Sequence, residues 1–585
     1  VAGLMGGEDD DAIVNAESGH ISLIATADTV ATGVSITVAG AADGEARTLP
    51  RATAVGLAGD GGNDLVVNQG ALEVLAVSKS YASSTSISVF GTTSAKAGTE
   101  VETTATGMSG GEGEDILMNT GILRVGPADG AIGDARWMSL LDTHASSFGF
   151  AGDTNAESAA FARTTSTGIA GGDDNDQVVN TGDITVIASA CNRSSSETVN
   201  IFGSSGAAGE SGAFTGAQGL SGGQGDDRID NAGNLTVDAN AELRLDGSSY
   251  TFGGSGDTGG VLAALTRVEG ITGGEGADTI TNSGRLDIDA RAALNSSGES
   301  EATFGGSSAS VVSGGQSYAA GIIGGEGDDI LANDDGGRVD VRSSTEVTTE
   351  SIAYTFGGGS DTDAVLTGDA IAVGLDGGVG NDLLSSHGVV EVEAEAILQS
   401  TGGAKHTLSW SSDSESTGQS VASARAFGLV GGAGDDLIET SGRIDVRAGV
   451  TAEVLNEASS GASITSDNEV GAVTRADAEA AGLSAGDGTN FVANGSDLTV
   501  AADSIAYAFA YASGASVSFD GDGLTRAESH ATATAAGIQA ADGENDVVNT
   551  GQIIVSANAA TAKTLETSIV VYNTGEETEP IDSPE

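Results

Sequence analysis

A recurring acidic glycine turn contains the residues best suited to chemistry. Its fullest copies are Gly222–Asp227 (GGQGDD) and Gly324–Asp329 (GGEGDD). Carboxylates are hard oxygen ligands, and glycine allows backbone carbonyls to point at an ion, so this combination suits Ca²⁺. The alternative is a glycine-rich structural turn whose acidic side chains are simply solvated.

The turn recurs eleven times, which makes the chain a stack of similar units rather than a conventional globule. Successive openings lie 51 to 55 residues apart, except for one interval of 61 residues that contains an insertion between Val125 and Phe148. We expect that insertion to form a loop on the flank of the stack. The repeats open at Gly3, Gly56, Gly107, Gly168, Gly219, Gly270, Gly321, Gly374, Gly428, Gly482 and Gly537.

Alternating apolar and polar residues follow each turn. In the fifth repeat Leu235, Val237 and Ala239 alternate with Thr236 and Asp238. This period of two is typical of a half-buried strand, and a second alternating run precedes the next opening. The sequence therefore predicts an all-β fold: a single elongated β-solenoid of about eleven repeats. Each repeat would contain an acidic turn, a long strand, a glycine-rich turn and a return strand.

One wide coil per repeat is favoured over two narrower coils, because the second half of each repeat has no turn resembling the first. One coil would place consecutive acidic turns about 4.8 Å apart, and two coils would double that separation. We expect residues 1–566 to form the solenoid. Residues 567–585 would form a C-terminal strand and an acidic tail, acting either as a cap or as a strand added to a neighbouring subunit.

Two further positions recur in most repeats. We expect the asparagines that follow the turn to form an amide ladder, and the aromatic residues that close the long strand to stack as a column. The asparagines are Asn15, Asn68, Asn119, Asn180, Asn231, Asn282, Asn333, Asn494 and Asn549. The aromatic residues are Phe90, Phe148, Phe202, Phe252, Phe304, Phe356, Trp410 and Phe519.

The charge of the chain limits its partners. The sequence has 84 acidic and 22 basic residues, a net charge of −62, which would repel nucleic acid and anionic membranes. Such a charge needs screening by salt or neutralisation by divalent cations. No run of 18 apolar residues predicts a membrane span. The single cysteine, Cys191, excludes an internal disulfide.

The turn resembles the nonapeptide of the RTX, or haemolysin-type, calcium-binding repeat proteins, Gly-Gly-x-Gly-x-Asp-x-apolar-x. The resemblance implies that turn carbonyls and aspartates of adjacent coils bind Ca²⁺. Here the motif occurs once per long repeat rather than back to back, and Asn490 and Asn545 replace the aspartate in the last two copies. The implied metal ligands are Asp11, Asp64, Asp115, Asp176, Asp227, Asp278, Asp329, Asp382 and Asp436.

A second resemblance concerns Asn-x-Gly-x-Ile-x-Val, as in Asn180–Val186, which is similar to repeats of β-helical autotransporter passengers and haemagglutinin-type adhesins. It is weakly specific, because any β-helix with an asparagine ladder would show it. Gly107–Gly111 and Gly219–Gly223 match the Gly-x-Ser-x-Gly elbow of hydrolases only formally, since both overlap the recurring turn. We therefore do not expect an enzyme.

These observations lead to a prediction of function. We expect an extracellular or cell-surface structural protein, of bacterial type, in which calcium stabilises the solenoid. It would assemble into a filament, sheath or S-layer-like array through end-to-end or strand-addition contacts between copies. The alternative is an adhesin stalk that binds surface carbohydrate or mineral through outward rows of Ser, Thr and Asp.

Overall fold

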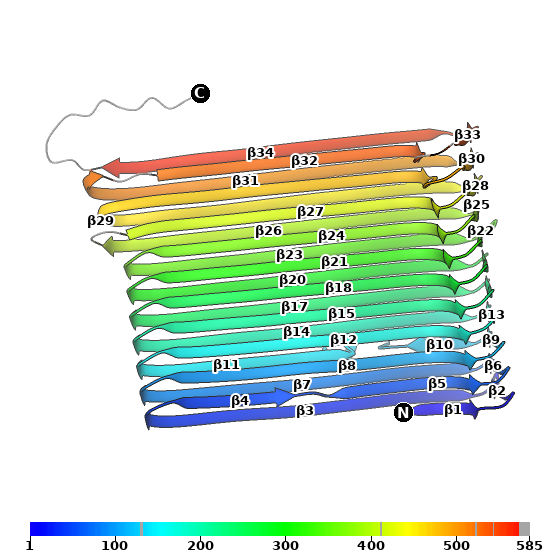
Figure 1. Ribbon diagram of the computed structural model, residues 1–585, viewed down its shortest axis with the longest axis horizontal. Helices are drawn as coiled ribbons and strands as arrows, with labels where there is room; N and C mark the ends of the chain where they lie inside the picture. The colour runs from blue at the N-terminus through cyan, green and yellow to red at the C-terminus, as the bar shows by residue number, and fades with distance from the viewer. Residues whose placement is uncertain (129–132, 410–411, 521–522, 542, 544, 572–585) are drawn as a thin grey trace.

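Every repeat forms one complete coil, and the coils stack in register along one axis (Figure 1). The computed structural model describes residues 1–128, 133–409, 412–520, 523–541, 543 and 545–571. Equivalent residues of consecutive repeats are direct strand partners, as when Asp230 in β16 (Arg228–Asn231) pairs with Thr281 in β19 (Thr279–Asn282). The predicted β-solenoid with one wide coil per repeat is confirmed.

Two long parallel sheets face each other across the interior. Sheet I contains the strands that follow the acidic turn: β3 (His20–Ala39), β7 (Ala71–Phe90), β10 (Ile122–Val125), β11 (Ser139–Ala151), β14 (Asp183–Phe202), β17 (Asn234–Gly253), β20 (Arg285–Phe304), β23 (Arg338–Gly357), β26 (Val389–Ser409), the first part of β29 (Arg443–Ser484), β31 (Asp497–Asp520) and β34 (Ile553–Val571).

Sheet II contains the return strands: β1 (Ala2–Gly7), β4 (Ala42–Thr48), β5 (Arg51–Gly61), β8 (Thr93–Glu112), β12 (Thr154–Asp173), β15 (Ser205–Gln224), β18 (Gly256–Glu275), β21 (Ser307–Glu326), β24 (Ser360–Val379), β27 (Ser412–Ala433), the second part of β29 and β32 (Gly523–Gln539).

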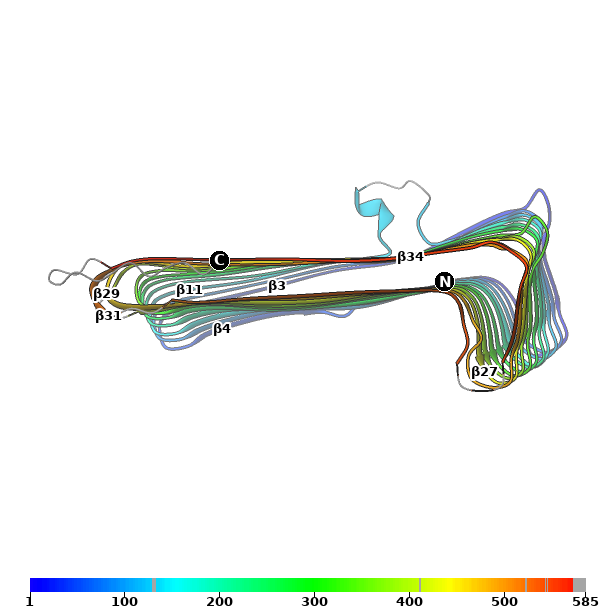
Figure 2. The same ribbon diagram turned by 90° about the horizontal axis from the view of Figure 1, so that it is seen from above.

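A short sheet closes one end of each coil, directly after the acidic turn. Its strands are β2 (Ala12–Asn15), β6 (Leu65–Asn68), β9 (Ile116–Asn119), β13 (Gln177–Asn180), β16, β19, β22 (Ile330–Asn333), β25 (Leu383–Ser386), β28 (Leu437–Thr440), β30 (Phe491–Asn494) and β33 (Asp546–Asn549). Seen along the stacking axis, each coil has a long flat two-layer arm that bends at the end carrying the short sheet (Figure 2).

The recurring opening glycine lies at this bend. In β8, a Cβ added to Gly107 would lie 2.5 Å from the carbonyl oxygen of Gly168 in the next coil and 2.8 Å from Cδ1 of Leu123. Real Cβ atoms do not approach other heavy atoms so closely, so the bend needs glycine. Gly107 and Gly168 are also not strand partners of each other, although the residues on either side are: the pairing passes from Thr106–Thr167 to Met108–Ile169.

The interior changes composition along the arm. Leucine, isoleucine and valine fill the region near the acidic turn, as in buried Leu235 and Val237, and small residues fill the rest. Towards the far end, inward hydroxyls bond across the two sheets, for example Ser194 to Ser158 at 2.7 Å. The prediction that the later strand halves turn their Ser and Thr rows outward is therefore wrong in part, because Ser194, Ser196 and Thr198 are buried.

The predicted asparagine ladder is present and buried. Each side-chain amide Nδ2 donates to Oδ1 of the equivalent asparagine one coil onward, at 2.7–2.9 Å from Asn15 to Asn333. Coils eight and nine substitute hydroxyls: Asn333 donates to Ser386, and Thr440 donates to Asn494. Asn494 then donates to Asn549 at 2.7 Å, so the ladder resumes.

The 61-residue repeat carries its extra residues as a flank loop, as predicted. Sheet I is interrupted after Val125 in β10 and resumes at Ser139 in β11; between them lies a 3₁₀ turn, η1 (Gly133–Arg136), which rises from the outer face (Figure 2). At the C-terminal side, β34 continues to Val571, so residues 567–571 of the predicted separate segment extend the last solenoid strand. Residues 572–585 lie outside the described residues.

We predict that Asn231→Ala destabilises the solenoid more than Asn234→Ala. Asn231 accepts from Asn180 and donates to Asn282, both at 2.8 Å and both buried. Its removal leaves two buried amide groups unpaired, each costing about 1–3 kcal/mol. Asn234 makes a bond of the same length to Asp183 in an exposed position. Thermal unfolding followed by circular dichroism checks the order, and equal losses of stability would contradict a structural role for the ladder.

Candidate functional site: the stacked acidic turn

The acidic turn links a return strand to the short sheet. In coil five the chain leaves β15 at Gln224 and enters β16 at Arg228. Gly223 and Gly225 have φ angles of 127° and 116°, a region that favours glycine. Their equivalents Asp60 and Asp174 adopt φ angles of 78° and 70°, which aspartate tolerates better than most residues. The turn shape is therefore kept where the glycine pattern fails.

The nine predicted aspartates form a continuous column across the coils. In each pair the backbone N–H of one aspartate donates to Oδ1 of the equivalent aspartate in the next coil, at 2.7–2.9 Å from Asp11 to Asp436. Asn490 and Asn545 continue the same ladder, because Asp436 donates to Asn490 and Asn490 donates to Asn545. The sequence thus identified a real column, and the structure shows that its carboxylates bond to neighbouring backbone.

These carboxylates point inward rather than into solvent. From Asp64 to Asp436 the residues are only 1–3% exposed, and each Oδ2 has no hydrogen-bond partner in the described part of the chain. Oδ2 lies over the first glycine of the turn: a Cβ on Gly431 would come within 2.5 Å of Asp436 Oδ2, and one on Gly377 within 2.6 Å of Asp382 Oδ2. The close approach of Oδ2 explains why the first residue of these turns is glycine wherever the column residue is aspartate.

Burial raises the pKa of the seven column carboxyls from Asp115 to Asp436. It raises the pKa to about 6 for Asp115 and Asp278, about 7 for Asp227 and Asp329, and about 8 for Asp176. The accepted backbone hydrogen bond acts in the opposite direction, and the negative charge of neighbouring acids raises these pKa values further.

A second ladder lies on the solvent side of the same turn. Where the residue before the column aspartate is Asp or Asn, its Oδ1 accepts the backbone N–H of the equivalent residue in the next coil. Asn63 donates to Asp10, Glu114 to Asn63 and Ala277 to Asp226 in this way, at 2.9–3.2 Å. This ladder runs in the direction opposite to the buried column. This ladder was not predicted from the sequence, although Asp or Asn fills the position in most coils and is the signal for it.

The column does not present a calcium site in this conformation. Each carboxylate uses Oδ1 for a backbone N–H, and only Oδ2 stays free, whereas calcium takes six to eight oxygens. Across the described residues, no three or more His, Cys, Asp or Glu side chains gather so that they could hold a metal ion. Calcium binding at the nine aspartates stays a prediction that rests on the resemblance of the turn.

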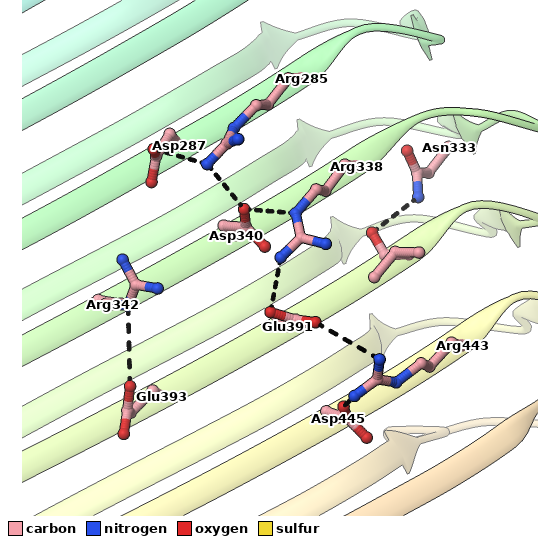
Figure 3. A network of polar contacts seen from close by, with 11 residues as sticks. Arg285, Asp287, Asn333, Arg338, Asp340, Arg342, Glu391, Glu393, Arg443 and Asp445 are labelled. Atoms are coloured by element: carbon pink, nitrogen blue, oxygen red, sulfur yellow. Dashed lines mark hydrogen bonds and ion pairs between the residues drawn. The ribbon is translucent and has the colours of Figure 1, made fainter.

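Opposite charges on the outer face of sheet I pair between coils (Figure 3). Arg338 in β23 contacts Asp340 at 2.6 Å and Glu391 of the next coil at 2.7 Å, while Arg443 reaches Glu391 from the other side at 4.0 Å. Arg285 also reaches Asp340, at 3.4 Å. Arg338 and Asp340 are neighbours within one strand, whereas the partners that join different coils are distant in the sequence and are brought together only by the stacking.

The predicted aromatic column exists, and it is exposed. Neighbouring rings meet edge to face at centroid distances of 5.6–6.2 Å, and each ring is 40–55% exposed, at the end of the arm opposite the acidic turn. Its members are Phe90, Phe150, Phe202, Phe252, Phe304 and Phe356. Phe148 was the wrong choice: it pairs with Ile87 and Val199 within sheet I. The side chains of Trp410 and Phe519 lie outside the described residues.

Comparisons with protein-family models, curated proteins and solved structures found no match to this chain. In the described residues no helix is long and apolar enough to cross a membrane. Ser109 and Ser221, the serines of the formal hydrolase elbow, lie within β8 and β15, ahead of a turn that leads into a strand rather than a helix.

We predict that the folded state loses stability as pH rises from about 4 to about 8. Burial raises the folded-state pKa of the column acids from Asp115 to Asp436 above 3.8, so the folded protein retains protons that the unfolded chain releases over this range. This contribution is fully present below the unfolded pKa and is lost as pH climbs through the folded values. Melting temperatures measured at constant ionic strength check this trend. A melting temperature that stays constant or rises between about pH 5 and about pH 8 would contradict it.

Proposed function

We propose that the protein is an extracellular structural protein, a β-solenoid that self-assembles into a filament, sheath or layer at the cell surface. The observation that carries the proposal is the continuity of interactions along the stacking axis. Backbone ladders, the asparagine ladder and the aspartate column repeat from coil to coil with the same donors and acceptors. Such repetition stiffens the stack along its axis, and stiffness suits a structural element.

The shape supports lateral association of such units. The longest dimension of the molecule runs along the strands, so each copy offers broad flat faces rather than the sides of a thin rod (Figure 1). The aromatic column adds an exposed apolar strip at one edge, and strips of this kind mark interaction sites. The net charge of −62 opposes contact between copies, so association requires salt or divalent cations.

Calcium belongs to this proposal only through the resemblance of the turn to RTX repeats. It would supply the counter-charge that self-association needs, and its predicted ligands are the nine column aspartates. Self-assembly does not depend on that assignment, since salt can also screen the charge. The two parts are therefore tested by different experiments.

A carbohydrate-binding adhesin is the second candidate, and one feature favours it. A shallow groove of about 740 Å³ crosses the outer face of sheet II. Phe161, Val261 and Val312 contribute apolar side chains to its lining, and Lys96 and Glu157, 2.7 Å apart, contribute charged ones. A lining that combines apolar and charged side chains suits a sugar ring. The groove differs from the outward Ser, Thr and Asp rows that the sequence suggested for this role.

We predict that Phe202→Ser/Phe252→Ser/Phe304→Ser weakens self-association in high salt, because it removes the exposed apolar strip without touching the interior. Sedimentation velocity and electron microscopy of the full chain measure assemblies. Phe161→Ser, an exposed phenylalanine of the groove, is the matched control and should assemble like the parent. Dispersed monomers of the parent at every salt concentration would refute self-assembly. If Phe161→Ser instead abolishes glycan binding by a monomeric parent, the adhesin proposal is favoured.

A further inference from the structure

The last two described turns change both partners of the buried contact together. Coils two to nine place a column aspartate over the first turn glycine, as Asp436 lies over Gly431. Coil ten has Ala485 and Asn490 at these positions, and coil eleven has Ala540 and Asn545. Where the carboxylate oxygen is replaced by an amide nitrogen, the glycine is also replaced. The residue at the first turn position and the residue in the column therefore change together.

The asparagines show which hydrogen bonds the turn supports. Oδ1 of Asn490 accepts the N–H of Asp436 at 2.7 Å, as a column aspartate would. Its Nδ2 donates to the carbonyl oxygen of Gly486, four residues earlier, at 3.2 Å. In coil eleven, Nδ2 of Asn545 donates to the carbonyl oxygen of Ala541, also four residues earlier, at 3.1 Å. The turn therefore offers an acceptor to the second side-chain atom at this position.

An ionised carboxylate does not match that environment. Burying an ionised carboxylate is costly when its oxygens lack donors, and in the described structure no donor reaches Oδ2 of the column aspartates from Asp64 to Asp436. The charged groups that act on the column are other acids. Asp176 faces Asp115 and Asp227 along the column and Asp174 in its own turn. The remaining neighbours are also acids: Asp226 beside Asp227 and Asp278, Asp328 beside Asp329 and Asp382, Asp376 beside Asp382, and Asp435 beside Asp436.

We propose that the buried column aspartates are protonated carboxylic acids in the folded protein. Oδ1 accepts the backbone N–H of the preceding coil, and the proton on Oδ2 makes that oxygen a donor toward the carbonyl four residues earlier, as the amides of Asn490 and Asn545 are. The ligand of this position is then a proton rather than a metal ion. Seven residues are included: Asp115, Asp176, Asp227, Asp278, Asp329, Asp382 and Asp436.

This inference is independent of self-assembly, and it gives the resemblance to calcium-binding repeats a specific alternative. Calcium at the column would have to displace the proton from Oδ2 and compete with the backbone N–H for Oδ1. Calcium binding at the column would therefore release protons and abolish the protonated carboxyl signal, whereas a proton-filled column would be indifferent to chelation.

Infrared spectroscopy of the full chain tests the proposal, because the C=O stretch of a protonated carboxylic acid is separate from carboxylate bands. At pH about 5.5 ordinary aspartates and glutamates, with pKa values of about 4, are ionised. We expect the parent to show the protonated band with and without chelator. Asp227→Asn/Asp278→Asn removes two of the seven acids and should weaken the band correspondingly. Asp226→Asn, the exposed neighbour in the same turn, is the matched control and should keep it.

A second comparison uses stability. Gly222→Ala should lower the melting temperature by several degrees, because the new methyl group meets Asp227 Oδ2. Adding Asp227→Asn should recover much of that loss, since the two substitutions together recreate the turn of coil ten. The parent spectrum decides the matter even if a variant fails to fold. An absent protonated band in the parent at pH about 5.5, or its loss on adding Ca²⁺ with release of protons, would overturn the proposal.

Discussion

The structure depends on one constraint: each residue lies beside its own equivalent in the next coil. Parallel in-register stacking places like side chains on like side chains, so any repeated residue type must be able to bond to itself or be screened from itself. Asparagine meets this condition because its amide has both a donor and an acceptor. Phenylalanine meets it through edge-to-face contacts. These two types consequently form the clearest columns.

Aspartate meets the condition less easily, because a carboxylate only accepts. The structure resolves the conflict by giving each aspartate a backbone donor from the adjacent coil instead of a side-chain partner. On the outer face of sheet I, acids and arginines bond across coils, as Arg338 does with Glu391. Charge repulsion in this acidic chain is thus handled locally in two ways, by backbone donors at the turn and by cross-coil ion pairs on the sheet.

The repeat made the fold predictable, since a turn spacing of 51 to 55 residues and alternating apolar positions define coil, strands and stacking without knowledge of any long-range contact. The direction of the aspartate side chains was not predictable. Strand alternation is interrupted in the turn, so the sequence does not show that Asp227 points inward. The choice of Phe148 over Phe150 failed for a similar reason, because the insertion obscures where the strand ends. Cross-coil ion pairs need the exact register, which the sequence gives only to within a residue or two.

The flank loop of the third coil shows how tolerant the stack is to added sequence. The chain leaves sheet I after Val125 and re-enters at Ser139, and both flanking strands keep their partners in the coils on either side. The ladders above and below are therefore kept, and Gly126 and Met138, at the two ends of the loop, still form backbone hydrogen bonds to the neighbouring coils. The same junction is a natural place to graft a foreign peptide, which the solenoid would display on a flat face at a fixed height.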